Sequence, residues 1–155
     1  PDGTTSRLDA IQAVVLRTKL SRLDDWNSRR VAIADNYRSV LGEIPQMLPS
    51  SAPLGTHVYH LFVIRAKKRD LVVAELDRLG IETGLHYPIP IHLQSGFQRF
   101  GFRRGDFPRA ELACEEVISL PIYPHMPDRD IERVTVSVLD SLAQITDSAP
   151  GSTVD

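Results

Sequence analysis

The stretch HVYHLFVIR, residues 57–65, decides the fold class because it joins β-branched and aromatic residues in an almost continuously apolar run. Such a run is typical of a strand that is covered on both faces. His57 and His60 are an odd number of positions apart, so in a strand their side chains point to opposite faces. We therefore predict that 57–65 is the central strand of a small sheet, with both histidines in packing or surface roles.

A helix is predicted directly after this strand. The segment RDLVVAELDRLG (69–80) places Val72 and Leu76 on one helical face and ends in Gly80, a typical helix stop. The basic run at 67–69 that precedes it is expected to be a solvated turn.

Two helices, or one bent helix, are predicted before the strand. Ser6 followed by Asp9 has the spacing of a capping box, so the first helix should begin near Ser6. From Leu23 to Val40 apolar residues recur at intervals of three and four, and Gly42 ends the pattern. A stripe of this length is stabilised mainly by packing, so we expect it to lie against more mass than a small sheet offers.

The rest of the chain is expected to hold shorter elements. They are a short strand in 81–88, a Gly/Phe/Arg loop at 96–108, a helix at 109–118, a short strand at 119–124 and a last amphipathic helix over 131–145. We divide the chain into a long helical segment (1–42), a small α+β domain (43–145) and a disordered tail (146–155).

Composition sets outer limits on the class of protein. The 155 residues suffice for one domain, and a net charge of -2 gives no basic surface for nucleic acid. No apolar run reaches the roughly 20 residues that span a bilayer, and no N-terminal signal sequence is visible, so the expected compartment is the cytoplasm. The single cysteine, Cys114, cannot form an internal disulfide and is expected to be a small buried residue on a helix.

The stretch GLHYPIPIH, residues 84–92, holds two histidines around a tyrosine and two prolines. An extended segment of six steps spans roughly 19 Å, whereas two ligands of one zinc bind at about 2 Å from the metal. Without a sharp turn, His86 and His92 cannot share a metal ion. The residues alone leave a choice between a stiff packing edge and a wall that faces a substrate.

Four blocks in this order resemble one family: GTTSRLDAIQAVVLRTKLSRLDDWNSRRVAIADNY, HVYHLFVIR, GIETGLHYPIPIHLQ and FPRAELACEEVISLPIYPHM. They resemble the C-terminal third of the DegT/DnrJ/EryC1/StrS sugar aminotransferases, over residues 3 to about 145. The resemblance implies the C-terminal small domain of an aspartate-aminotransferase-like enzyme (fold type I), with a small sheet covered by helices and preceded by a long helix. It implies a homodimer that uses pyridoxal 5'-phosphate to move an amino group from glutamate to a nucleotide-linked keto sugar. Such reactions serve the biosynthesis of lipopolysaccharide, surface polysaccharide and antibiotic sugars.

The resemblance also implies roles for individual residues. Thr5 stands where the family usually has an asparagine that reaches the cofactor phosphate of the other subunit, and Arg7 matches an arginine of the same region. A salt bridge that caps the helix is an alternative role for Arg7. His86, Tyr87 and His92 are implied to face the sugar-nucleotide pocket, and simple packing is the alternative for Tyr87 and His92.

The catalytic lysine implied by the family has no counterpart in this chain. The three lysines, Lys19, Lys67 and Lys68, fall on a predicted helix and a polar turn, so we expect this chain alone to be inactive. Two alternatives stay open: a sugar dehydratase of the same family, and a non-catalytic interaction domain. We further expect the chain alone to self-associate through the face from Leu23 to Val40.

Overall fold

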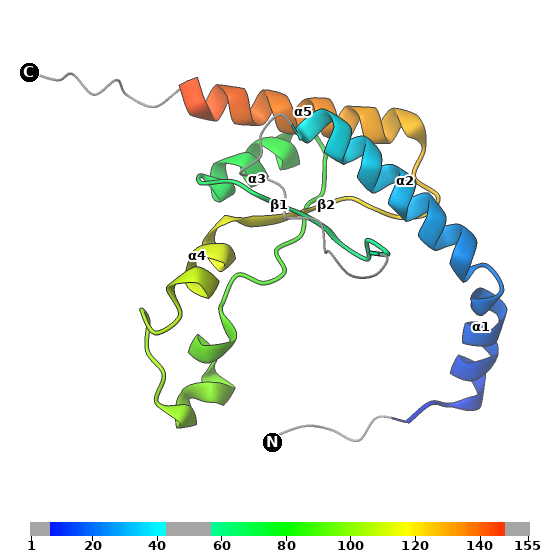
Figure 1. Ribbon diagram of the computed structural model, residues 1–155, viewed down its shortest axis with the longest axis horizontal. Coiled ribbons are helices and arrows are strands. Elements are labelled where there is room, and N and C mark those ends of the chain that lie inside the picture. Colours follow the sequence, from blue (N-terminus) through cyan, green and yellow to red (C-terminus); the bar gives the residue numbers. More distant parts are fainter. Residues whose placement is uncertain (1–6, 43–56, 148–155) are drawn as a thin grey trace, which may run out of the picture.

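A computed structural model describes residues 7–42 and 57–147 (Figure 1). In chain order the elements are α1 (Ala10–Leu20), α2 (Leu23–Leu41), β1 (Phe62–Arg65), α3 (Arg69–Arg78), the 3-10 helices η1 (Ile91–Leu93) and η2 (Ser95–Phe100), α4 (Pro108–Glu116), β2 (Val117–Leu120) and α5 (Asp128–Asp147).

The sheet consists of two antiparallel strands in the part of the chain that the structure describes. β1 pairs with β2 in a register that sets Phe62 opposite Leu120 and Ile64 opposite Ile118. Phe62, Ile64, Ile118 and Leu120 are buried, whereas Arg65 is exposed. The predicted covering of both faces along the whole stretch is therefore wrong, because only alternate residues of β1 are fully covered.

The predicted strand 57–65 is also too long. Tyr59 has a φ of 48°, and its backbone N–H donates to His57 Nδ1 at 2.9 Å. A left-handed residue interrupts an extended chain, so β1 begins only at Phe62. His57 and His60 accordingly precede the strand, so strand alternation does not point their side chains to opposite faces.

Three helices share the core with the sheet. α2 buries Ile33, Ala34, Tyr37 and Leu41, which lie on one helical face, and it packs against α5. α3 buries Val72 and Leu76 and packs against α5 and β2. Figure 1 shows α2, α3 and α5 together on one side of the strands. α2 thus shares one hydrophobic core with α3, α5 and the two strands. The predicted domain boundary after residue 42 stays a prediction.

Tyr37 connects α2 to the chain that follows β2. Its hydroxyl donates to the carbonyl oxygen of Pro121 at 2.8 Å. Burial, with a smaller contribution from Tyr123, raises the pKa of Tyr37 well above its usual range, so the phenol stays protonated as a donor.

Helix α1 is the part of the described chain with the least packing. None of its residues is buried, and large apolar side chains are exposed on it and just before it: Leu8, Ile11, Val14, Val15, Leu16 and Leu20. The predicted start near Ser6 is wrong, because Asp9 is the N-cap and the Gln12 side chain accepts its backbone N–H at 3.3 Å.

Of the two N-terminal helices, α1 rather than α2 carries the uncovered apolar side chains. In α2 only the two ends of the predicted stripe, Leu23 and Val40, are exposed, and its middle packs on α5. The expectation of an exposed apolar face along α2 from Leu23 to Val40 is therefore wrong.

Several element boundaries differ from the prediction. Residues 81–88 form no strand beyond an isolated bridge between Gly84 and Ser119. The second strand is 117–120 instead of 119–124 because Pro121 cannot donate to a ladder. The last helix is longer than predicted and runs to Asp147, and most of the predicted tail lies outside the described residues.

The basic run at 67–69 is not wholly a solvated turn. The Arg69 guanidinium donates to the carbonyl oxygens of Cys114 and Val117, and Lys68 Nζ donates to the carbonyl oxygen of Ile145. These contacts tie the start of α3 to the end of α4 and to α5. Among the described helices, none is long and apolar enough to cross a membrane.

Candidate functional site

The segment 84–92 leaves the sheet and forms one wall of the candidate site. Gly84 and Ser119 exchange two backbone hydrogen bonds, of 3.0 and 2.8 Å, which attach the start of the segment to the edge of β2. From there the chain continues through Pro88, Ile89 and Pro90 to η1, where His92 is buried.

His86 is held at the beginning of this wall. Its Nδ1 lies 2.9 Å from the hydroxyl oxygen of Ser119, which is buried on β2. The ring also covers Gly84: a β-carbon added at Gly84 would lie 2.5 Å from His86 Cε1. His86 is an exposed residue, and only its Nδ1 has a hydrogen-bond partner among the described residues.

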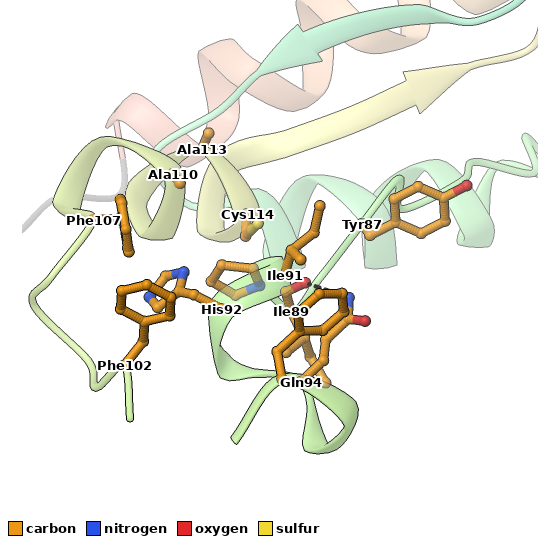
Figure 2. Close-up of a pocket in the computed structure, with 12 residues that line it drawn as sticks. Tyr87, Ile89, Ile91, His92, Gln94, Phe102, Phe107, Ala110, Ala113 and Cys114 are labelled. Carbon is orange, nitrogen blue, oxygen red and sulfur yellow. Dashed lines mark hydrogen bonds between the residues drawn. The ribbon is translucent and has the colours of Figure 1, made fainter. Parts of the chain in front are cut away.

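Tyr87 stands beside His86 at the edge of an apolar pocket. The two rings meet edge to face with centroids 5.4 Å apart, and Tyr87 is 68% exposed. The pocket has a volume of about 510 Å³. Its lining is mostly aliphatic and aromatic and includes Ile89, Ile91, Phe97, Phe102, Phe107 and Cys114. Figure 2 shows Phe102, Phe107 and His92 gathered at one end of the pocket and Tyr87 at the other.

His92 forms part of the pocket wall and is only 9% exposed. Its Nε2 lies 3.0 Å from Glu111 Oε1 on α4. The two carboxylate oxygens of Glu111 also accept the backbone N–H of Gly105, at 2.8 and 3.0 Å. Gly105 has a φ of 97°, a conformation that favours glycine. This cluster joins η1, the loop 101–107 and α4, and it holds the loop that carries Phe102 and Phe107.

The Glu111 carboxylate is the charged member of this cluster. Burial alone would raise its pKa, but the hydrogen bonds from Gly105, His92 and Phe107 outweigh burial and lower the pKa below its ordinary value. Glu111 is therefore ionised near neutral pH and accepts a hydrogen bond from Nε2–H of His92.

The remaining predicted site residues lie elsewhere. Arg7 is exposed just before α1, and the structure gives it no contact with His86, Tyr87 or His92. Figure 1 shows α1 at the right and the η1, η2 and α4 region at the left of the molecule. Thr5 lies outside the described residues. Within one chain, His86, Tyr87 and His92 thus lie on one segment, and Arg7 lies apart from them.

The described residues form no site for pyridoxal phosphate or for a metal ion by themselves. Lys19 is exposed on α1, and Lys67 and Lys68 lie in the turn before α3, so no lysine lines the pocket. The pocket is also too apolar for a phosphate group. These residues alone do not fit the cofactor. The described part of the chain has no group of three His, Cys, Asp or Glu side chains that could hold a metal ion.

Sequence reasoning missed Ser119 and Glu111, which are the partners of His86 and His92. Each is distant in sequence from its histidine, by 33 and 19 positions respectively. Ser119 could have been noticed as a single polar residue in an apolar strand, whereas nothing local in PRAEL distinguishes Glu111 from an exposed helix residue.

The model of the DegT/DnrJ/EryC1/StrS aminotransferase family matches residues 2–139. The chain belongs to the DegT/DnrJ/EryC1/StrS family. The fold class predicted from the sequence, the small α+β domain of such an aminotransferase preceded by a long helix, is confirmed.

Among the curated relatives, the chain is 44% identical to the dTDP-3-amino-3,4,6-trideoxy-alpha-D-glucose transaminase of Streptomyces venezuelae, over 88% of this chain and 36% of the relative. It is 42% identical to the erythromycin biosynthesis sensory transduction protein EryC1 of Saccharopolyspora erythraea, over 88% of this chain and 37% of the relative.

Among solved structures, the chain superposes on S. venezuelae DesV in complex with a ketimine intermediate, with a TM-score of 0.83, 44% identity, and coverage of 89% of this chain and 38% of DesV. It also superposes on a family aminotransferase from Brucella abortus, with a TM-score of 0.81, 28% identity, and coverage of 90% and 37%. The chain thus spans somewhat more than a third of the length of these relatives.

Proposed function

We propose that the protein containing this chain is, at full length, a pyridoxal-phosphate-dependent aminotransferase. It would move an amino group from glutamate to a nucleotide-linked keto sugar, as a cytoplasmic homodimer. The observation that carries the proposal is the family match over residues 2–139, which includes the HYPIPIH segment. The relatives named as transaminases act on dTDP-linked sugars by their names, which supports a nucleotide sugar as substrate.

In this proposal the chain supplies the sugar side of the active site. His86 and Tyr87 are exposed next to each other, and the backbone that carries them is bound to β2, so both rings can contact a polar substrate from a rigid base. His92 already bonds Glu111, so its contribution to substrate binding would come through the shape of the pocket wall or through direct ring contact. When bound, pyridoxal phosphate supplies the electron sink for moving the amino group.

The exposed α1 supports an active site that is completed by a second subunit. Six large apolar side chains at and before α1 are uncovered, which favours burial against protein outside the described residues. Arg7 lies just before this helix, and Figure 1 shows α1 apart from the region of α4. Thr5 and Arg7 would therefore contact the cofactor of one site while His86 and Tyr87 of the same chain face another.

A direct test uses the full-length protein with pyridoxal phosphate, ¹⁵N-glutamate and a dTDP-linked keto hexose. The proposal predicts a ¹⁵N-labelled amino sugar nucleotide by mass spectrometry. Loss of water from the sugar without gain of nitrogen would identify the family's dehydratase reaction instead. Failure to bind the cofactor, with stable folding, would favour a non-catalytic interaction domain.

A further inference from the structure

One polar contact at the candidate site involves a residue with no assigned role, Ser119. Ser119 is 4% exposed on β2, and its hydroxyl lies 2.9 Å from His86 Nδ1. Its backbone N–H and carbonyl oxygen are both bonded to Gly84, so the serine cannot shift without breaking the bridge. A buried, doubly anchored hydroxyl is a rigid support for an exposed imidazole.

Gly84 leaves room for the same ring, because it has no side chain. A β-carbon at this position would lie 2.5 Å from Cε1 and 3.1 Å from Nδ1 of His86. The imidazole therefore occupies the space that any other residue at position 84 would fill. Ser119 and Gly84 together restrict both the position and the orientation of the ring.

The direction of the Ser119–His86 hydrogen bond follows from counting donors. Within the described residues, the Ser119 hydroxyl has His86 Nδ1 as its one side-chain partner. If Nδ1–H donated, the buried hydroxyl proton would have no acceptor there, and an unpaired buried donor is costly. If the hydroxyl donates to Nδ1, its proton is used, and the neutral ring carries its own proton on Nε2.

We propose that Ser119, supported by Gly84, is a positioning residue that holds His86 in the Nε2–H form, so that His86 donates a hydrogen bond to an oxygen of the nucleotide-sugar substrate. His86 is exposed, and its Nε2 has no hydrogen-bond partner among the described residues. A keto, hydroxyl or phosphate oxygen is the acceptor that such a donor fits. The inference rests on the proposed function, in which His86 faces the sugar.

A double-mutant cycle in the full-length enzyme tests the positioning role. His86→Ala should lower kcat/KM for the keto sugar about tenfold or more, as expected for the loss of one hydrogen bond to substrate. Ser119→Ala should lower it by a smaller factor, and Ser119→Thr, which keeps the hydroxyl, should restore it. In the His86→Ala background Ser119→Ala should have no further effect, because Ser119 acts through the imidazole. Equal, additive losses in both backgrounds would overturn the proposal.

Ser141→Ala is the matched control for removing a buried serine hydroxyl. Ser141 is 1% exposed on α5 and donates to the carbonyl oxygen of Ser137 at 2.7 Å, away from the site. Its removal should leave the sugar kinetics unchanged. A loss of kcat/KM as large as that of Ser119→Ala would show that the Ser119 effect comes from general destabilisation, and it would overturn the proposal.

Two substitutions of His86 test which nitrogen donates. Glutamine can place an amide N–H near the position of Nε2, whereas asparagine places it near Nδ1. His86→Gln should therefore retain more sugar turnover than His86→Asn. The reverse order would overturn the assignment of the donor to Nε2.

¹⁵N NMR of histidine-labelled full-length protein tests the pairing without any activity. The neutral His86 ring should show a protonated Nε2 and an unprotonated Nδ1, and Ser119→Ala should raise the fraction with a proton on Nδ1. A wild-type ring protonated on Nδ1 would overturn the pairing even if the enzyme is active. If instead His86→Ala leaves the sugar kinetics unchanged while the NMR result holds, the sugar-facing function of His86 and its donor role fail, and the Ser119 support remains.

Discussion

Gly84→Ala is predicted to disturb the candidate site while leaving the fold almost as stable as before. The added β-carbon would lie 2.5 Å from His86 Cε1, far inside contact distance. Gly84 does not have a positive φ, so alanine is compatible with its backbone. The strain therefore falls on the His86 ring, which is exposed and can rotate away.

The size of the effect follows from two opposing contributions. Rotation of the ring breaks the bond from the Ser119 hydroxyl to Nδ1, at a net cost of about 0.5–1.5 kcal/mol. Replacing glycine by alanine restricts the unfolded chain and stabilises the fold by about 0.4–1 kcal/mol. The free energy of unfolding should thus fall by no more than about 1 kcal/mol. If the ring could not move, overpacking would cost about 1–3 kcal/mol instead.

Urea unfolding, followed through the fluorescence of Trp26, measures the change in stability, because this single tryptophan lies on α2 and contacts His125. Gly96→Ala is the matched control, since a β-carbon there meets nothing within 4 Å. In the full-length enzyme Gly84→Ala should lower sugar turnover, and Gly96→Ala should not. A large loss of stability in Gly84→Ala, or a crystal structure in which His86 still bonds Ser119, would refute this reasoning.

Three further outcomes follow from the packing and charges of the described residues. Glu111→Gln should lower the melting temperature at neutral pH. Because folding lowers the pKa of Glu111, the difference in stability between the wild type and the variant should be constant above the ordinary pKa of 4.5 and should shrink as the pH falls through the folded-state pKa. A stability difference that does not change with pH would contradict this. Leu76→Ala, at a fully buried position of α3, should cost about 2–5 kcal/mol in urea unfolding, whereas Leu71→Ala on the exposed face of the same helix should stay within about 0.5 kcal/mol. Ile11→Glu, at a residue 80% exposed on α1, should reduce self-association of the chain in sedimentation velocity without changing its stability, and unchanged association would show that α1 is not the contact surface.

Helix positions were predictable because their signals are local. The repeat of apolar residues in α2 and α3, and the glycines that follow them, depend only on neighbours within two turns. The strand was harder, because its length depends on the turn at Tyr59 and on pairing with β2, more than fifty positions away. The start of α1 was misplaced because Ser6–Asp9 and Asp9–Gln12 both have capping-box spacing, and the chain uses the second.

In the candidate site, too, the local features could be predicted and the long-range contacts could not. The segment 86–92 was found from its composition and from the family resemblance. What holds it was not found, because Ser119 and Glu111 reach their histidines only through the folded arrangement of β2 and α4. The roles implied for Thr5, Arg7, His86, Tyr87 and His92 stay predictions.

The central claim is that this chain provides the sugar-facing wall of a sugar aminotransferase. It is tested most directly by single-turnover measurements of each half-reaction in the full-length His86→Ala variant, followed by the cofactor's absorbance. The account predicts that the half-reaction with glutamate keeps its wild-type rate, while the half-reaction with the keto sugar slows or needs a higher sugar concentration. A sugar half-reaction with wild-type rate and concentration dependence would contradict it.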